Sequence, residues 1–189
     1  MTAVWVIIGI IAVLLIWFMA IFNSLVRLRN QVKNAWAQID VQLKRRYDLI
    51  PNLVDTVKGY VKHERGTLEA VTKARNLAQQ ASSSGASVGA RSKAEAGLSS
   101  ALARLLVVVE NYPDLKASQN FLALQEELTS TENKISFSRQ YYNDSVLRYN
   151  NQTQVMPSNI VAGMTGFTAS EFFEITLPEE KKAPKVSFT

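Results

Sequence analysis

The sequence predicts an all-α protein in which an N-terminal transmembrane helix continues into an antiparallel bundle of long helices. Three observations carry this prediction. An apolar run opens the chain, and apolar residues then recur at helical spacing. No segment before residue 155 keeps the two-residue alternation that is typical of a strand. Together these features favour a helical bundle over any fold that contains a sheet.

The opening run extends from Val4 to Phe22 without a charged residue. At 1.5 Å per residue, a helix of that length is about 28 Å long, close to the thickness of a bilayer core. No basic residue precedes the run and Met19-Ala20-Ile21 is a poor cleavage site, so a retained anchor over residues 1–23 is favoured over a signal peptide. Trp5 and Trp17 lie near the two ends, where lipid-facing aromatic residues are common.

Three basic residues follow the run before the first acidic residue, Asp40; they are Arg27, Arg29 and Lys33. The positive-inside rule therefore predicts a short external N-terminus and a cytoplasmic body. Arg27 and Arg29, and marginally Lys33, lie close enough to the membrane to attract anionic lipids, at about 1 kcal/mol each. Membrane lipids are thus the first expected partner.

The net charge of +5 is concentrated in the segment that leaves the membrane. Residues 23–75 hold 11 basic and 5 acidic side chains, whereas residues 76–189 hold 10 and 11. No nucleic-acid motif accompanies this charge, so a basic juxtamembrane arm is favoured and no nucleic-acid partner is expected. The chain has no cysteine, which excludes thiol chemistry and disulfides.

The bundle is predicted to occupy residues 24–156. Its first helix, over about 24–81, follows an apolar stripe with a mean spacing of about 3.6 residues, the period of an amphipathic α-helix. Pro51 removes a helical hydrogen bond at a cost of about 3 kcal/mol, so a kink or brief break is expected near 47–51. The stripe consists of Leu25, Leu28, Val32, Trp36, Ile39, Leu43, Tyr47, Ile50, Val54, Val57 and Val61.

Two further helices are expected after a loop. The small, aperiodic residues of 82–91 predict the loop, and a helix over about 92–111 ends at the turn signal Asn111–Asp114. The next helix, over about 118–155, has a spine with a mean spacing of about 3.5 residues, which is typical of left-handed coiled packing. That spine consists of Phe121, Leu124, Leu128, Thr131, Ile135, Ser138, Tyr142, Ser145 and Tyr149.

An apolar C-terminal segment, 157–177, follows the bundle, and 178–189 is predicted to be disordered. The apolar segment must dock on its own bundle, on another subunit or on a bilayer. Docking on protein is favoured, because no basic amphipathic helix accompanies the segment. Phe172 and Phe173 are therefore candidate interface residues.

A second candidate interface is the basic cluster Lys44, Arg45 and Arg46. In a straight helix Arg46 lies roughly 36 Å beyond Phe22, whereas salt screens lipid charge within about 8 Å. Two interpretations stay open for this cluster. It pairs within the chain, with acids such as Glu126, Glu127 or Glu132, or it contacts a neighbouring subunit or partner. Tyr141 and Tyr142 are further candidates, because adjacent helical residues point to different faces and at least one should lie at an edge or interface.

The sequence shows no convergent catalytic groups. The one histidine, His63, stands beside Glu64, and neither an H-E-x-x-H, a G-x-S-x-G nor a Walker A pattern occurs. A single histidine without cysteine cannot form the usual zinc set. We therefore expect a protein that is not an enzyme and that uses no cofactor or metal.

Segments spread over nearly the whole chain resemble the LemA family of bacterial membrane-anchored proteins. One departure is Gly66 beside Arg65, where a stronger helix former is expected, and it weakens the predicted helix at that point. The matching segments are Asn23–Val26, Ala35–Arg46, Tyr47–Val54, His63–Glu64, Ala74–Arg75, Tyr112–Ala117, Leu124–Leu128, Tyr142–Asp144, Pro157–Asn159 and Phe172–Glu174.

The resemblance implies an α-helical bundle and a short external N-terminus at the inner membrane of a bacterium. It supplies no biochemical activity, although relatives in magnetosome-forming bacteria make membrane organisation a natural theme. We therefore expect a non-catalytic, membrane-anchored scaffold that self-associates as a homo-oligomer and organises or shapes the cell membrane. The alternative is an adaptor that binds another membrane protein, such as a protease or transporter.

Overall fold

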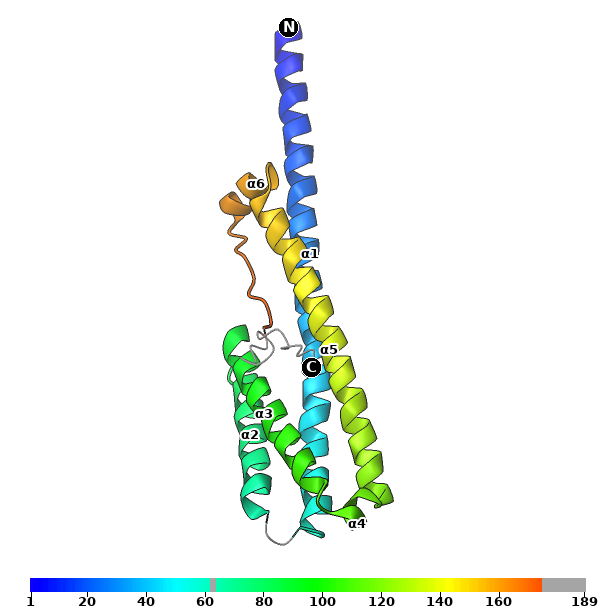
Figure 1. Ribbon diagram of the computed structural model, residues 1–189. Helices are drawn as coiled ribbons and strands as arrows, with labels where there is room; N and C mark the ends of the chain where they lie inside the picture. Colours follow the sequence, from blue (N-terminus) through cyan, green and yellow to red (C-terminus); the bar gives the residue numbers. More distant parts are fainter. Residues whose placement is uncertain (62–63, 175–189) are drawn as a thin grey trace, which may run out of the picture. The chain divides into compact units, whose positions relative to one another are not determined.

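The computed structural model describes residues 1–61 and 64–174 (Figure 1). Within these ranges the chain is built from helices and contains no strand, which confirms the all-α prediction. The expected disorder of 178–189 and the residue His63 lie outside the described residues. The helices are α1 (Thr2–Lys58), α2 (Arg65–Ser83), α3 (Val88–Val109), α4 (Pro113–Lys116), α5 (Gln119–Gln154) and α6 (Ser158–Thr165).

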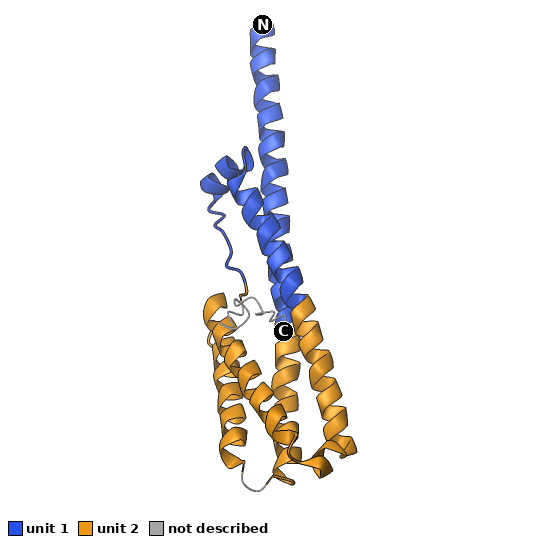
Figure 2. Cartoon of the chain, in the orientation of Figure 1, with its two compact units in different colours: residues 1–39, 138–172 blue, residues 40–137, 173–189 orange. Residues whose placement is uncertain are grey.

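The chain divides into two compact units (Figure 2). Unit 1 comprises residues 1–39 and 138–172, and the described part of unit 2 comprises residues 40–61, 64–137 and 173–174. Helices α1 and α5 therefore each contribute to both units.

Unit 1 begins with an exposed apolar stretch of α1. Among the described helices, α1 is the one that is long and apolar enough to cross a membrane, and none of its apolar window is buried. Beyond this stretch, α1 packs with the C-terminal part of α5, as in the pair of Trp36 and Tyr142, and with Phe167 after α6. The apolar residues buried there are Leu25, Val32, Ala35, Ile39, Tyr142, Val146, Tyr149, Val161, Ala162 and Phe167.

An extended segment after α6, residues 167–172, completes unit 1. Side chains of α5 bind the main-chain atoms of this segment. The side-chain amide of Asn150 donates to the carbonyl of Ser170 at 2.9 Å and accepts from the Ser170 amide at 2.8 Å. The hydroxyl of Tyr142 donates to the carbonyl of Glu171 at 2.9 Å. Gly166, with φ of 75°, ends α6 in a left-handed conformation and turns the chain into this segment.

Unit 2 is a helical bundle in which α1 and α2, α2 and α3, and α3 and α5 run in opposite directions (Figure 1). Alternating direction is the natural result of short connections between long helices. The apolar core consists of Leu43, Tyr47, Ile50, Leu53, Val57, Val61, Leu68, Val71, Ala78, Leu98, Leu105, Val109, Leu115, Phe121 and Ile135.

Helix α1 passes through Pro51 without interruption, so the break expected near 47–51 is absent. A proline has no amide hydrogen, and the carbonyl of Tyr47, four residues earlier, therefore lacks its usual partner in the helix. Arg75 of α2 supplies one, because its Nε donates to the Tyr47 carbonyl at 2.8 Å. The helix ends instead at Lys58, and α2 begins at Arg65, beside the weak position Gly66.

The loop expected over 82–91 is shorter than predicted, because α3 begins at Val88 rather than near 92. Ser87 caps the helix by accepting a hydrogen bond at Oγ from the amide of Ala90, at 3.3 Å. Gly85, with φ of 66°, provides the turn between α2 and α3. Small residues thus continue the helix once a serine cap has started it.

Candidate functional site

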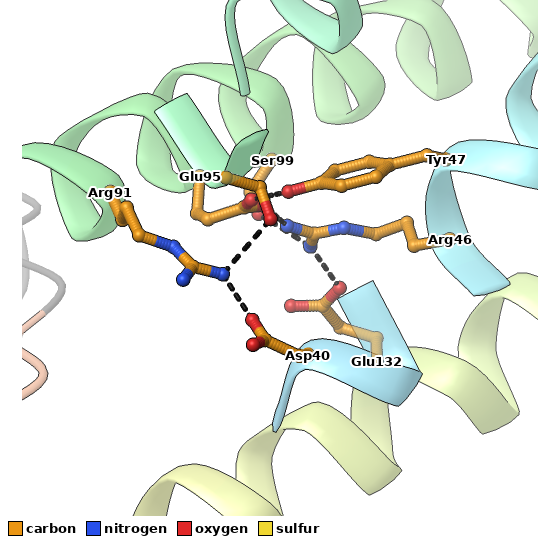
Figure 3. A network of polar contacts seen from close by, with 8 residues as sticks. Asp40, Arg46, Tyr47, Arg91, Glu95, Ser99 and Glu132 are labelled. Carbon is orange, nitrogen blue, oxygen red and sulfur yellow. Dashed lines mark hydrogen bonds and ion pairs between the residues drawn. The ribbon is translucent and has the colours of Figure 1, made fainter. Parts of the chain in front are cut away.

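The described part of unit 2 contains a cluster of charged side chains within its core, where α1, α3 and α5 meet (Figure 3). At its centre is Arg46 of α1, of which only 2% is exposed. Its guanidinium donates to the buried carboxylate of Glu95 on α3 and, at 2.6 Å, to Oε2 of Glu132 on α5. A further hydrogen bond of 3.1 Å reaches Ser99 Oγ on α3. One arginine therefore ties three helices together.

Two neighbouring pairs extend the cluster. The hydroxyl of Tyr47 donates to the second carboxylate oxygen of Glu95. Arg91 of α3 forms an ion pair with Asp40 of α1 and donates to Ser82 Oγ at 3.0 Å. Burial, followed by the negative charge of Glu95, raises the pKa of the Tyr47 hydroxyl far above its usual value. The tyrosine therefore remains a proton donor at physiological pH.

The chemistry of this cluster is structural. Arg46 and Tyr47 both donate to Glu95, so the central groups of the cluster are engaged with one another through this carboxylate. The guanidinium of Arg46 is paired through both terminal nitrogens, although its Nε has no hydrogen-bond partner. Paired charges in a core favour one register of the helices, since a shifted helix would leave a buried charge unpaired. No group of acidic or histidine residues in the described ranges is arranged to hold a metal ion.

The structure separates the three residues of the predicted basic interface. Lys44 and Arg45 are exposed, and Arg45 pairs with Glu127 at 2.6 Å across two side chains that are 47% and 49% exposed. Arg46 is buried, and this corrects its assignment as an interface residue. Arg46 lies on the inner face of α1, where its charge pairs with Glu95 and Glu132. Of the two interpretations, pairing within the chain is therefore the one that applies to Arg46.

The two tyrosines of α5 also differ. Tyr141 is exposed, and its hydroxyl accepts a hydrogen bond of 3.3 Å from Gln31 Nε2. Tyr142 is buried and packs edge-on against Trp36, with 5.1 Å between ring centroids. Burial raises the pKa of the Tyr142 hydroxyl above its ordinary value, and Glu171 adds to the effect. The interface assignment is therefore corrected for Tyr142, which belongs to the core of unit 1.

Phe172 and Phe173 likewise have different surroundings. Phe172 is exposed, whereas Phe173 is almost completely buried, which corrects its assignment as an interface residue. Successive side chains of an extended segment point to opposite sides, so one of two adjacent phenylalanines can be buried while the other faces out.

The juxtamembrane residues are exposed and one has an unexpected partner. Trp5, Trp17, Arg27 and Lys33 all lie on the exposed surface of α1. The guanidinium carbon of Arg29 stands 4.8 Å from the ring centroid of Phe167, a cation–π contact. Phe22 packs edge-on against the same ring at 5.7 Å. The residues after α6 therefore dock beside the end of the apolar run.

Sequence reasoning missed the partners of Arg46 on α3. A signal for them exists: the apolar stripe of Leu98, Leu105 and Val109, continued backwards at helical spacing, reaches Glu95 and then Arg91. Charged residues on an otherwise apolar stripe indicate a buried pair. Asp40 carried no comparable signal, because a single acid on a long helix is usually a solvated residue.

Comparison with known proteins places the chain in a family. A family model described as LemA matches residues 35–188. Protein LemA of Metamycoplasma hominis is 30% identical over 142 residues, which cover 74% of this chain and 63% of that protein.

Two magnetosome proteins are also similar over a shorter region. Magnetosome protein MamQ 2 of Paramagnetospirillum magneticum is 33% identical over 81 residues, or 43% of this chain and 30% of that protein. Magnetosome protein MamQ of Magnetospirillum gryphiswaldense is 31% identical over 80 residues, or 42% of this chain and 29% of the relative. The match thus spans less than a third of each MamQ protein. With its exposed apolar helix and its all-α bundle, the chain is a membrane-associated helical protein and belongs to the LemA family.

Proposed function

We propose that this protein is a non-catalytic scaffold that α1 anchors in the bacterial inner membrane, and that copies of it associate to organise or shape that membrane. The observation that carries the proposal is the composition of α1. This single helix contains both the exposed apolar run and Arg46, which binds α3 and α5. Helical backbone, rather than a flexible loop, therefore connects the anchor to a bundle whose register is fixed by buried charge.

The same helix presents the surface through which copies would associate. Val41, Lys44, Arg45 and Asp48 are exposed and lie three or four residues apart, on one face of α1. The face combines an exposed apolar side chain with charges of both signs. In a two-fold pair each patch meets its own copy, so Lys44 of one copy can face Asp48 of the next. Relatives that are named magnetosome proteins support a role in an organised membrane structure.

Mass photometry of the detergent-solubilised full chain tests the association. We expect oligomers for the natural sequence and a shift toward monomers for Val41→Glu combined with Lys44→Glu. Lys93→Glu combined with Val107→Glu, which makes the same charge change at two exposed positions of α3, is the matched control and should leave the mass unchanged. A natural chain that stays monomeric at micromolar concentration would remove self-association from the proposal.

One observation favours the second candidate function, an adaptor for another membrane protein. An open groove of about 910 Å³ lies between the end of α1 and α2 in unit 2. Its lining combines the apolar Val54 and Leu68 with the basic Lys58 and Lys73, and Arg65 in the same lining pairs with Glu69 at 2.8 Å. Such a groove suits an apolar segment that carries acidic residues.

Cysteine crosslinking in membranes separates the two functions. Leu77→Cys places a thiol in the groove, and Lys44→Cys places one on the proposed association face. Crosslinked dimers of this chain from Lys44→Cys support the scaffold. A single foreign partner that is captured from Leu77→Cys and not from Lys93→Cys supports the adaptor instead.

A further inference from the structure

Helix α6 has apolar residues on two opposite faces, and only one of them is covered. Val161 and Ala162 are buried against unit 1, as expected for an apolar segment that docks on its own chain. Ile160 and Met164, one turn apart on the other face, are 53% and 74% exposed. A short helix on a water-facing surface normally carries polar residues on its outer face. The exposed residues of this helix are Ile160, Gly163, Met164 and Thr165, of which only the terminal threonine has a polar side chain.

The turn that leads into α6 has the same character. Val155 and Met156 are 51% and 76% exposed, and with Ile160 and Met164 they form what we call the apolar tip. No charged residue occurs between Arg148 and Glu171, although charged residues make up 20% of the chain. A solvated turn of this length would be expected to contain charge, whereas a segment in contact with lipid would avoid it.

The contacts within unit 1 place the apolar tip beside the anchor. Phe167, directly after α6, packs against Phe22, the last residue of the apolar run. Arg29, about two turns further along α1, covers the same ring. Figure 2 shows α6 at the end of unit 1 from which the exposed apolar part of α1 projects. The apolar tip, the aromatic pair Phe22–Phe167 and Arg29 therefore follow one another in the same order as the acyl chains, the interface and the headgroups of a bilayer.

We propose that the apolar tip, Val155, Met156, Ile160 and Met164, is a second membrane-contact site that inserts into the acyl–headgroup boundary of the bilayer that α1 enters. The tip carries no charged residue, and Phe167, which follows it in the chain, packs against Phe22 at the end of the apolar run. The site would take a lipid surface as its partner, while Arg29 remains beside Phe167 at the level of the phosphates. This proposal rests on the proposed placement of α1 in the bilayer.

Single-cysteine spin labels on the full chain in phosphatidylethanolamine–phosphatidylglycerol vesicles test the proposal, since the natural chain has no cysteine. The probes are Met164→Cys at the tip, Val13→Cys in the apolar run, and Val107→Cys on α3 as an equally exposed apolar control. Power saturation compares access of apolar oxygen with access of a polar nickel chelate. We expect a high oxygen-to-nickel ratio at Val13 and Met164 and a low ratio at Val107.

The other outcomes are distinct. If Val13→Cys shows a high ratio and Met164→Cys responds like Val107→Cys, the tip lies in water and this inference is overturned while the anchor stands. If Val13→Cys itself is accessible to nickel, the anchor proposal fails first. If Met164→Cys is shielded from both relaxants and its spectrum is broadened by a second label, a copy of the chain covers the tip and lipid contact is again overturned.

Discussion

Arg45 and Arg46 are adjacent and chemically identical, yet Arg45 binds a glutamate at the exposed surface and Arg46 binds one in the core. Successive residues of an α-helix point about 100° apart, so Arg45 faces water while Arg46 enters the core. An exposed ion pair is worth at most about 1 kcal/mol, because water screens both charges and competes for them. Removing one partner of a buried pair costs about 3–5 kcal/mol, since the charge that remains has no solvent.

Arg46→Ala is therefore expected to lower the free energy of unfolding by about 3–5 kcal/mol, and Arg45→Ala by less than about 1 kcal/mol. Denaturant unfolding of the full chain in detergent, followed by circular dichroism, measures both values. The two variants remove the same side chain from the same helix, so each controls for the other. Equal losses would show that burial does not set the strength of the Arg46 pairs.

Tyr47 gives the cluster a dependence on alkaline pH. Its raised pKa means that the folded chain keeps a proton which the unfolded chain loses above about pH 10. The unfolded state then binds fewer protons than the folded state, so stability falls as the pH rises through that value. Below about pH 10 the contribution of the neutral hydroxyl is fully present.

We expect Tyr47→Phe to destabilise the protein by about 1–3 kcal/mol at neutral pH, because Glu95 loses a donor. The advantage of the natural chain over this variant should stay constant up to about pH 9. Above about pH 10 it should shrink by about 1.4 kcal/mol per pH unit. Unfolding curves of both proteins from pH 7 to 11 provide the test, and a pH-independent difference would contradict it.

At the scale of elements, the continuity of α1 depends on a residue of another helix. Pro51 leaves the Tyr47 carbonyl without its amide partner, and Arg75 of α2 donates to that carbonyl. The same contact joins α1 to α2, so the proline creates a docking point between two helices where a break would be expected. Pro51 is exposed, and its ring therefore displaces solvent rather than core residues.

A double-mutant cycle with Pro51→Ala and Arg75→Met measures this coupling. In the natural chain Arg75→Met leaves the Tyr47 carbonyl unpaired and should cost about 1–3 kcal/mol. In the Pro51→Ala background the new amide satisfies that carbonyl, so the cost should fall by about 1 kcal/mol or more. Equal costs in both backgrounds would show that Arg75 stabilises the bundle by another route.

At the scale of the whole molecule, the charge distribution bears on the proposed orientation. The basic residues nearest the apolar run all follow it, and no basic side chain precedes it. Positive residues within about 15–20 residues of a membrane helix dominate its topology, whereas distant ones have little effect. Arg27, Arg29 and Lys33 should therefore hold the C-terminal body in the cytoplasm.

A C-terminal fusion of green fluorescent protein should fluoresce, and a C-terminal alkaline phosphatase should be inactive. Replacing Arg27, Arg29 and Lys33 by glutamine, together with Thr2→Lys and Ala3→Lys, should reverse both signals. Lys44→Gln combined with Arg45→Gln lies beyond the effective range and serves as the control, with signals like those of the natural chain. Phosphatase activity in the unaltered fusion would contradict the proposed orientation.

The sequence predicted the helices well because each carries an apolar stripe of helical period, and stripe residues such as Ile39 and Leu43 are buried. It predicted the partners of the basic residues only in part, since Glu127 and Glu132 were among the expected partners, whereas Glu95 was not. Helical spacing shows that Arg46 shares a face with core residues, but its partners lie 49 and 86 positions away on helices whose relative register a single sequence does not contain. Helix α6 was not predicted, because it is too short to show a periodic pattern. Its buried and exposed faces are distinguishable only once it is packed against the rest of unit 1.

The way in which α5 holds the segment after α6 leaves the side chains of that segment free to vary. Asn150 and Tyr142 hold it by binding main-chain atoms of Ser170 and Glu171. Main-chain atoms are common to all residues, so these bonds place no demand on side chains at the exposed positions Thr168 and Glu171. Substitutions at Thr168 and Glu171 should therefore be close to neutral for stability. Substitutions at Tyr142 and Asn150 of α5, which are distant in the chain, should instead release the segment.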